Sequence, residues 1–569
     1  MTESLVGHAP RTLRVGLLVD GLDQPRWVRA ALEEIERSGV ARVVLLVRDA
    51  TPAAPSAGKL RTYYRNRRVL LYSLYRRLDA RRYTLDADPF EPTEIGSLYR
   101  NVPVLDVRPR RTKHSDYFED ADLDTIRGYD LDVAVRLGFR ILRGGVLDIA
   151  RYGVWSYHHG DNNVNRGGPA GFWEVMEGHP VTGSILQVLS EDLDGGRVLY
   201  RSYSSTERIS VNRNLQNYYW KTSLFIARAL RALRDDLQRG VDPATPQPHP
   251  VTAYSRRLYT APGNLEMARL MTRLAGRVVR QKVRHTLHRE QWCLAYRRSP
   301  PSPESPSLPD LTMFRFNLVV PPADRFWADP FPVIVDGRYV ILFEEFIHAT
   351  GKGHIAAAEL DSSGRLGSPI RVLEEPHHLS YPFLFEWKGT HYMIPESADN
   401  ASVDLYRARR FPVEWEHERT LIEGVKLYDA TLAEIDGRWW LFASTATFAA
   451  STYEELNVYY ADSPLGPWHP HERNPVVSDV RRARPAGRLF CHRGAWYRPA
   501  QDGSGAYGSA VEIRRITRLA PDVYEEEPAT RIDPSWDSRI VGLHTINHIP
   551  GLTVIDARLW RSKFHRSRR

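Results

Sequence analysis

Short apolar runs alternate with an amphipathic segment at the start of the chain. Residues 13–20 (LRVGLLVD) and 41–49 (ARVVLLVRD) read as buried strands, and residues 24–39 between them repeat apolar positions at helical spacing and end at Gly39. Strand, helix and strand in this order predict a parallel sheet with right-handed crossovers. The turn at Asp20–Asp23 lacks the G-x-G-x-x-G spacing of a dinucleotide loop, so the pattern does not indicate a dinucleotide site.

Residues 131–199 continue the pattern and place polar side chains just beyond strand ends. A strand is expected at Val133–Leu137 and another at Gly153–Tyr157, which leads into His158 and His159. A helix and a further apolar strand then lead to a turn that carries Asp192 and Asp194. Ligands of open α/β sheets bind beyond the carboxyl ends of the strands, so we expect a site here. We expect the side chain of His158 to face it and that of His159 to face the other way.

Three short segments in this stretch suggest a family. They are Ser156-Tyr157-His158, residues 165–169 (NRGGP) and residues 193–196 (LDGG). Their order resembles the formyltransferases that use 10-formyltetrahydrofolate, among them the methionyl-tRNA, glycinamide ribonucleotide and amino-sugar formyltransferases. That family has Asn-x-His, a Pro-x-x-Arg-Gly loop and a Leu-Asp-x-Gly turn. Ser156 stands where the family has the Asn that helps to hold the formyl oxygen.

The resemblance implies transfer of a formyl group from 10-formyltetrahydrofolate to an amine. A His that donates a hydrogen bond or a proton stabilises the oxyanion that develops, and a nearby Asp orients and charges that His. The implied catalytic residues are His158, Asp194 and Ser156, with Leu137, Gly138 and Asp192 at the folate and Asn162 and Arg166 at the substrate. Asn162 or Asn163 could also supply the missing amide. The alternative is that His158 and Asp194 are retained by the fold and no longer perform chemistry.

From about residue 311 the chain changes to short aromatic-rich strands that repeat. Five units each contain a strand, a turn with Gly and a second strand, and the turn glycines Gly337, Gly389, Gly437, Gly494 and Gly551 lie 48 to 57 residues apart. In the first three units the Gly follows Pro330, Pro382 or Ala430 by seven residues. A period near 50 residues with β-hairpins predicts a β-propeller, and five units predict five blades.

This repeat region resembles the five-bladed propellers of glycoside hydrolases and fructan-active enzymes. Residues 326–330 (FWADP) and 498–502 (RPAQD) resemble more closely the propeller of the glucosamine inositolphosphorylceramide transferases. The resemblance implies one residue per blade at a central pocket: Asp329, then Ser380 or Tyr381, then Asp429, Arg484 and His544. Hydrolysis would need two carboxyl groups, one of them neutral. Asp329 and Asp429 could form that pair, and Glu396 could reach in. We expect at least one to be paired with Arg484 or His544, which favours glycan binding over hydrolysis.

The fold class expected is therefore multidomain: a Rossmann-like α/β formyltransferase-like domain over residues 1–210, a helical and Pro-rich connector over 211–310, and an all-β five-bladed propeller over 311–569. One long helix is expected over 214–238. Residues 59–82 and Asn264–Arg289 read as basic helices, the second with an apolar line at Leu265, Leu270, Met271, Leu274, Val278 and Leu287. These helices pack between or on domains, or they contact a membrane surface peripherally.

Composition and charge limit the class of protein further. The chain has 569 residues, two cysteines (Cys293 and Cys491), a net charge of +9 and no apolar run that could span a bilayer. The two cysteines make no disulfide framework, and the start shows no signal peptide, so we expect a cytoplasmic protein, with peripheral contact at the inner membrane face as an option. No metal site is indicated.

Three functions remain open. The first is a formyltransferase that acts on an amino sugar in surface-glycan biosynthesis, with the propeller holding the glycan. The second is a glycosyltransferase or a glycoside hydrolase with its chemistry in the propeller, and the third is a glycan-binding protein with a degenerate first domain. Nucleic acid is not favoured as a partner, because a propeller stands where the methionyl-tRNA enzymes carry a tRNA-binding barrel.

Overall fold

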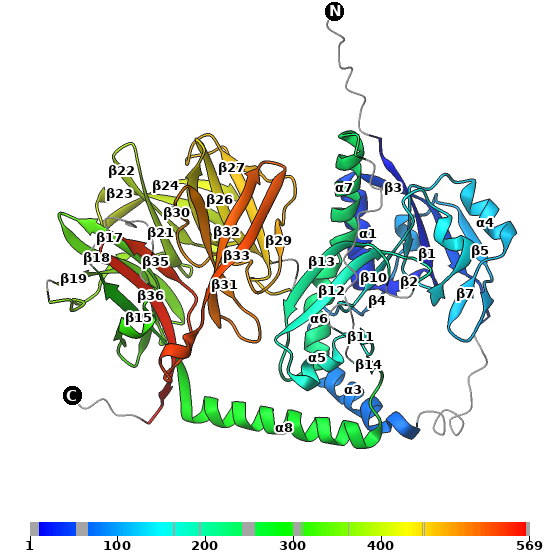
Figure 1. The fold of residues 1–569 in the computed structure, drawn as a ribbon, viewed down its shortest axis with the longest axis horizontal. Coiled ribbons are helices and arrows are strands. Elements are labelled where there is room, and N and C mark those ends of the chain that lie inside the picture. The colour runs from blue at the N-terminus through cyan, green and yellow to red at the C-terminus, as the bar shows by residue number, and fades with distance from the viewer. Residues whose placement is uncertain are drawn as a thin grey trace, which may run out of the picture. The chain divides into compact units, whose positions relative to one another are not determined.

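The computed structural model describes residues 11–564 apart from 53–66, 163–164, 193–194, 242–256, 300–308, 310, 362, 447 and 449. The chain divides into two compact units, the first mainly Met1–Ser202 with Thr206–Leu274 and the second mainly Ala275–Thr447 with Ser451–Arg569 (Figure 1). The boundary therefore falls inside the expected connector 211–310, because part of that segment packs into each unit. No helix in the described residues is long and apolar enough to cross a membrane.

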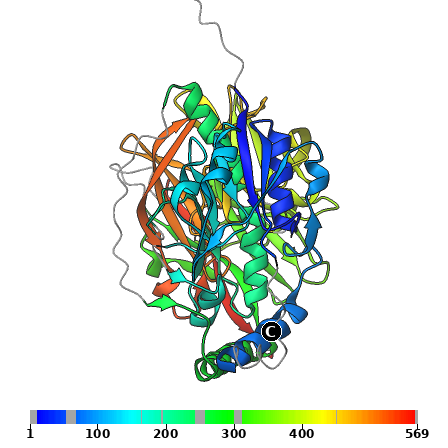
Figure 2. The same cartoon turned by 90° about the vertical axis from the view of Figure 1, so that its right-hand side faces the viewer.

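A seven-stranded sheet forms the centre of the first unit. Its strands follow the order β13-β12-β10-β8-β1-β3-β5, and the run from β10 to β5 is parallel, whereas β10 and β12 are antiparallel. In Figure 2 the strands β1 and β3 of this sheet are dark blue. The strands are β1 (Leu13–Val19), β3 (Ala41–Asp49), β5 (Val104–Val107), β8 (Val133–Arg136), β10 (Val154–His158), β12 (Val181–Val188) and β13 (Val198–Ser205).

Helix α1 (Arg26–Ser38) connects β1 to β3 as the apolar spacing predicts. It buries Trp27, Val28, Ala31, Leu32 and Ile35 in the main core of this unit, and Gly39 ends it in the left-handed conformation (φ 62°). A residue without Cβ favours that conformation at a helix end. The parallel α/β sheet expected from the sequence is therefore confirmed.

The helix expected over 214–238 is wrong as a single element. The structure has α6 (Val211–Thr222) and α7 (Phe225–Gln238), with Ser223 and Leu224 between them. Ser223 Oγ donates to Trp220 O at 2.7 Å, and Thr222 Oγ1 donates to Tyr219 O at 2.8 Å. Such local side-chain bonds compete with the helical ladder, which accounts for the break.

The two basic helices expected from the sequence differ from that expectation in their bounds and in which residues they bury. Part of 59–82 lies outside the described residues, and the described part forms η1 (Arg67–Val69) and α3 (Leu70–Tyr83). In α8 (Asn264–Leu287) the expected apolar line is confirmed at Leu270 and Leu274, which are buried together with Met267. It is wrong at Leu265, Met271 and Leu287, which are exposed. The smaller elements of this unit are β2 (Asp23–Pro25), β4 (Pro92–Glu94), η2 (Gly96–Leu98), β6 (Arg110–Arg111), β7 (Ser115–Tyr117), α4 (Asp120–Arg127), β9 (Ile141–Leu142), η3 (Gly144–Asp148), β11 (Arg166–Gly167), α5 (Phe172–Glu177) and β14 (Leu258–Tyr259).

Antiparallel sheets of four or five strands build the second unit. The first is β17 (Arg325–Val335), β18 (Arg338–Ile347), β19 (Lys352–Leu360) and β20 (Ile370–Leu373); the second is β21 (Ser380–Trp387), β22 (Thr390–Glu396), β23 (Ser402–Arg410) and β24 (Glu414–Glu423). The third is β25 (Leu427–Ile435), β26 (Arg438–Thr445), β27 (Glu455–Ala461), β28 (His469–Pro470) and β29 (Val477–Ser478); the fourth is β30 (Phe490–His492), β31 (Ala495–Asp502), β32 (Ala510–Ala520) and β33 (Val523–Ile532). The last combines β15 (His288–Arg298), β16 (Asn317–Val319), β34 (Ile540–Gly542), β35 (Ile546–Ile549) and β36 (Leu552–Ser562).

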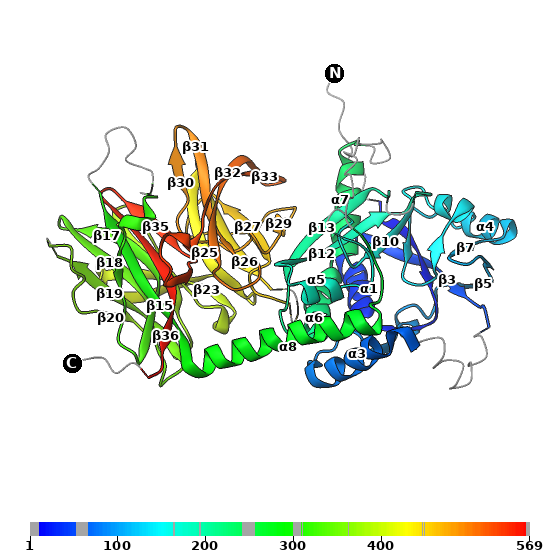
Figure 3. The same cartoon turned by 60° about the horizontal axis from the view of Figure 1, so that its bottom comes forward.

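The last of these sheets joins the two ends of the second unit. Strand β15 pairs along its whole length with β36, 264 residues later at Cys293 and Ala557. The two strands lie side by side, green beside red, in Figures 1 and 3. Residues 288–298 of the expected connector therefore belong to the strand-rich unit, because they complete the sheet that the C-terminal strand begins.

The repeated glycines make hairpin turns, as the repeat predicts. Gly337, Gly389, Gly437, Gly494 and Gly551 have φ between 74° and 83°, and each lies between two paired strands. In the first four turns the residue before the Gly also has positive φ, from 49° to 52°. Two consecutive positive φ values are typical of the type I′ turn, whose twist matches that of the strands it joins.

Candidate functional sites

The first candidate site is a cavity of about 150 Å³ at the carboxyl ends of β8 and β10. Its walls come from these two strands, from β9 and from the end of β12 with the turn that follows. The residues that line it are Arg136, Ile141, Leu142, Arg143, Ser156, Tyr157, His158, Gln187, Leu189, Ser190, Glu191, Asp192 and Gly196. The sequence therefore located the cavity, and three of its predicted residues, Ser156, His158 and Asp192, line it.

Arg136 and Ser156 form the polar floor of this cavity. Arg136 Nη1 donates to Ser156 Oγ at 3.0 Å, while its other nitrogens donate to Arg140 O and Phe139 O. Burial lowers the pKa of Arg136, and the carboxylates of Asp20 and Asp116 oppose that shift. The guanidinium remains charged, so a fixed positive charge contacts Ser156.

Gln187 faces Ser156 across the antiparallel pair β10–β12. Its side chain is only 7% exposed, and its Oε1 has no hydrogen-bond partner among the described residues. A buried acceptor without a partner costs free energy, on the order of 1–3 kcal/mol, and is rare in native proteins. Gln187 is one of the residues that line the cavity, so a ligand bound there could supply a donor to this oxygen.

The two histidines separate as predicted. His158 lines the cavity, whereas His159 stacks on Tyr219 with 3.7 Å between ring centroids and on Tyr157 with 5.8 Å. Complete burial lowers the pKa of His159 to about 3, so its ring stays neutral at physiological pH. His159 therefore belongs to the aromatic packing of the unit.

The remaining predicted residues of the first unit lie elsewhere or outside the described residues. Leu137 packs against the main core, and Gly138 N donates to Leu18 O at 3.0 Å, so neither lines the cavity. Asn162 and Arg166 bond to each other, Arg166 Nε donating to Asn162 O at 3.3 Å, and they too lie away from it. Asp194 and Asn163 lie outside the described residues.

A second candidate site lies in the strand-rich unit, at bulges in three successive sheets. Asp329, Tyr381 and Asp429 are buried and have φ of 49°, 43° and 56°. Each sits in a register shift of the first strand of its sheet, in β17, β21 and β25. Positive φ in a residue with a side chain costs of order 1–3 kcal/mol and recurs at functional sites. The sequence left open whether Ser380 or Tyr381 corresponds to Asp329 and Asp429. The positive φ of Tyr381 shows that Tyr381 is the corresponding residue.

Asp429 is held by a two-point ion pair. Arg484 Nε and Nη2 donate to Asp429 Oδ2 and Oδ1 at 2.5 and 3.0 Å, and Gln501 Nε2 adds a bond to Oδ2 at 2.8 Å. Burial would lower the pKa of Arg484, but the charge of Asp429 raises it well above its ordinary value. The expected pairing of an axial carboxylate is therefore present.

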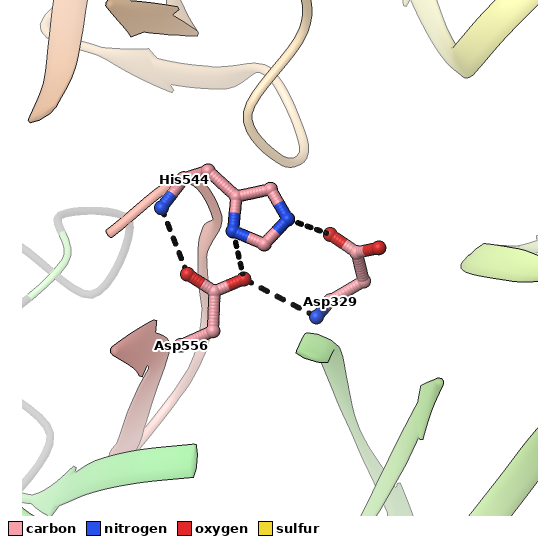
Figure 4. Close-up of side chains that lie close together, drawn as sticks. All are labelled: Asp329, His544 and Asp556. Carbon is pink, nitrogen blue, oxygen red and sulfur yellow. Dashed lines mark hydrogen bonds and ion pairs between the residues drawn. The ribbon is translucent and has the colours of Figure 1, made fainter. Parts of the chain in front are cut away.

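Asp329, His544 and Asp556 form one hydrogen-bonded group (Figure 4). Asp556 accepts the backbone N–H groups of His544, Thr545 and Asp329 at 2.8, 3.1 and 3.2 Å. His544 Nδ1 lies 2.8 Å from Asp556 Oδ2, and its Nε2 lies 3.3 Å from Asp329 Oδ1. Three ligand atoms converge here. Because Asp556 already accepts three N–H groups, the arrangement is that of a structural anchor that aims His544 at Asp329.

Burial raises the pKa of other carboxyl groups around this site. Burial raises the pKa of Asp329 to about 6, although the charge of His544 lowers it. Burial and the charge of Asp429 raise the pKa of Glu396 to about 7, and burial raises that of Glu344 well above its usual range. The site thus combines the ion-paired Asp429 with carboxyl groups whose pKa burial raises, that of Glu396 to about 7. The expectation that at least one carboxylate would be paired is met by Asp429, whereas the raised pKa values were not predicted, because the sequence could not show how deeply these groups are buried.

Sequence reasoning missed several residues of both sites. Arg136 ends a buried strand, Gln187 interrupts the apolar run of β12, and Asp556 interrupts that of β36. Each is a polar residue that follows two or more buried apolar residues in its strand. That contrast was the available signal, since a buried polar group needs a partner or a ligand.

Comparison with known proteins separates the two units. Residues 315–537 match the family model described as glucosamine inositolphosphorylceramide transferase 1, N-terminal. The transferase of that name from Oryza sativa subsp. japonica is 40% identical over 208 residues, which cover 36% of this chain and 28% of that protein. The methionyl-tRNA formyltransferase of Sulfurihydrogenibium sp. is 23% identical over 194 residues, which cover 34% of this chain and 59% of that protein. The chain thus spans little more than a quarter of the length of the first relative.

Among solved structures, Zg3597 of Zobellia galactanivorans, a family 117 glycoside hydrolase, is 17% identical with a TM-score of 0.31. It covers 49% of this chain and 93% of its own.

Proposed function

We propose that this protein transfers a formyl group from 10-formyltetrahydrofolate to the amino group of a sugar, and that its strand-rich unit, a five-bladed propeller, holds the glycan part of the acceptor. The observation that carries the proposal is the cavity at the carboxyl edge of the parallel sheet, where Arg136, Ser156, His158 and Gln187 meet. The similarity of part of the chain to methionyl-tRNA formyltransferases supports it. The similarity of residues 315–537 to a sugar transferase family supports the glycan part.

The cavity fits the reacting end of such a donor. The Oε1 of Gln187 can accept an N–H. The hydroxyl of Ser156 accepts from Arg136 Nη1 and donates to Tyr157 O at 3.2 Å, and it could turn that proton to a bound formyl oxygen. A volume of about 150 Å³ is below the 300–1,000 Å³ typical of whole-ligand pockets, so it suits the reacting end of the donor alone. When bound, 10-formyltetrahydrofolate would supply the formyl group, and Ser156, Gln187, Glu191 and Asp192 would hold it.

His158 is the residue we assign to the proton. It lines the cavity beside Ser156, and as a general acid it would donate where negative charge grows on the formyl oxygen. Arg136 donates a hydrogen bond to Ser156, and its positive charge would stabilise the same negative charge on the formyl oxygen. Asp194 keeps the role implied by the family resemblance, which is to orient His158 and accept a proton from the amine.

A second candidate function is favoured by the neutral carboxyl groups of the propeller. Glu396, with a pKa of about 7, could act as an acid, and Asp429, fixed by Arg484, could act as a carboxylate. Cleavage or transfer at a glycosidic bond uses such a pair, one carboxyl group as the acid and one carboxylate as the nucleophile or base. Under this second candidate function the first unit would have no catalytic activity, and the propeller would catalyse the reaction.

Binding measurements separate the two candidates. The full chain is titrated by calorimetry with a folate analogue whose formyl group cannot be transferred, and separately with nucleotide-activated amino sugars. We expect saturable folate binding that is lost in Arg136→Met and kept in Asp429→Asn. Folate binding that is absent from the wild type, together with sugar binding lost in Asp429→Asn, would favour the second candidate.

A further inference from the structure

A cavity of about 250 Å³ lies in the strand-rich unit around Arg488. It is lined by residues 332–334 of β17, residues 384–386 of β21, and His391, Phe411 and Ile549. None of the buried carboxyl groups of the second candidate site lines this cavity, although strand β17, which contributes to its wall, also carries Asp329. The cavity is therefore a separate place from the one the proposed function uses.

Arg488 contributes a positive charge to this cavity that no carboxylate balances. Its Nη1 and Nη2 donate to the backbone oxygens of Pro332 and Leu384 at 3.4 and 3.0 Å. Within the described residues it forms no ion pair, and its buried Nε has no partner. By contrast, the buried guanidinium groups of Arg484 and Arg498 each contact a carboxylate, that of Asp429 or Glu526.

Burial acts on this charge without removing it. It lowers the pKa of Arg488 to about 10, so the side chain stays protonated at neutral pH. A buried charge without a counter-ion is costly, and an anion that enters the cavity would relieve that cost. Two of the five guanidinium N–H groups are used by the backbone, which leaves donors for a carboxylate or a phosphate.

Aromatic and aliphatic side chains form part of the remaining walls of the cavity. His391 and Phe411 stack with 3.8 Å between ring centroids, Phe385 adds a third ring, and Ile334 is 48% exposed. Glu386, the acidic residue among the lining, is exposed to solvent and does not shift the pKa of Arg488. Aromatic and aliphatic walls around one oriented polar group are typical of small-molecule sites.

We infer that this cavity binds an acidic sugar, with its carboxylate or phosphate at Arg488 and its ring against His391, Phe411 and Phe385. The ligand class follows from a guanidinium without a carboxylate partner beside aromatic rings in a cavity of about 250 Å³. The inference adds a second glycan contact to the propeller and does not depend on formyl transfer. It implies that one acidic residue of an extended glycan could bind in the Arg488 cavity while another part of the same glycan binds at a different site.

The test is calorimetric titration of the full chain with D-glucuronate, a D-glucose phosphate and neutral D-glucose. We expect one or both acidic sugars to bind and D-glucose to bind at least roughly tenfold more weakly, since hydrogen bonds to a charged group are the stronger kind. The two acidic probes distinguish a carboxylate from a phosphate as the anion. Equal binding of all three sugars, or of none, would overturn the inference.

Variants locate the binding. Arg488→Gln should abolish it. Because that change also removes bonds to two backbone carbonyls, Ile334→Glu and Ile334→Gln serve as a second pair at an exposed position of the same cavity. We expect Ile334→Glu to weaken acidic-sugar binding roughly tenfold relative to Ile334→Gln, through like-charge repulsion. If both Ile334 variants bind acidic sugars as tightly as the wild type, the anion lies elsewhere and the inference is wrong.

Discussion

Ser156 and Gln187 stand opposite each other on neighbouring antiparallel strands, and both line one cavity. Ser156 stands where the resemblance to folate-dependent formyltransferases would place an Asn, and Gln187 brings a carboxamide to the same face from the next strand. Opposite Cβ atoms in such a pair lie about 4.5–5.5 Å apart. The amide that is missing at position 156 is therefore available from across the pair.

Gln187→Met should lower formyl transfer by roughly ten- to a hundredfold, because it removes the amide at nearly constant volume. Stability should change little or rise slightly, since the wild-type Oε1 is buried without a partner. Steady-state kinetics and thermal unfolding measure the two effects. Gln238→Met, at the exposed end of α7, is the control. Turnover that is unchanged in Gln187→Met would remove Gln187 from the site.

Ser156→Asn should raise formyl transfer or leave it measurable. The change restores the amide that the family uses, and Arg136 can still donate to the new carbonyl oxygen. The position is only 2% exposed, so the variant is assayed for folding as well as for kcat/KM. A folded variant with no activity at all would mean that this pocket is built for other chemistry.

Glu396 should make the stability of the strand-rich unit depend on pH. Its pKa rises from the ordinary 4.5 to about 7 in the folded protein, so the folded state holds a proton that the unfolded state releases. The contribution is complete below pH 4.5 and is lost as pH rises through 7, by up to about 3 kcal/mol. Glu396→Gln should therefore flatten the fall in unfolding midpoint over this range. Glu386→Gln, at an exposed position, should leave the slope as in the wild type.

The ion pair between Arg484 and Asp429 should show strong coupling. Arg484→Met alone leaves a buried carboxylate without its partner and should destabilise the protein by about 3–5 kcal/mol. Asp429→Asn combined with Arg484→Met should recover a large part of this loss, because no buried charge remains. Chemical denaturation of the four members of the cycle gives the coupling. Single effects that add without coupling would mean that the pair is not held as the structure shows.

Local chemistry explains what the sequence could predict. Gly337, Gly389 and Gly437 were found because a type I′ turn requires positive φ, and the register from these turns led back to Asp329 and Asp429. His158 and Asp192 were found because they follow strand ends. These signals are carried by residues that are close in the chain.

Tertiary structure explains what the sequence could not predict. Arg136, Gln187 and Asp556 lie inside strands, and only the pairing of those strands with others brings them to a site. The pairing of β15 with β36 joins residues more than 250 positions apart, so no local pattern marks residues 288–298 as part of the propeller unit. The burial that neutralises Glu396 likewise depends on every sheet around it.

The most direct test follows an isotope-labelled formyl group from 10-formyltetrahydrofolate into a panel of nucleotide-activated amino sugars, with the full chain as catalyst. We expect a labelled N-formyl sugar with the wild type, and roughly a hundredfold or greater loss of turnover in His158→Ala with an unchanged unfolding midpoint, since general acid–base residues contribute about 10²–10⁴-fold. Label transfer that proceeds equally well in His158→Ala, or no transfer to any amino sugar by a wild-type protein that binds them, would contradict the account.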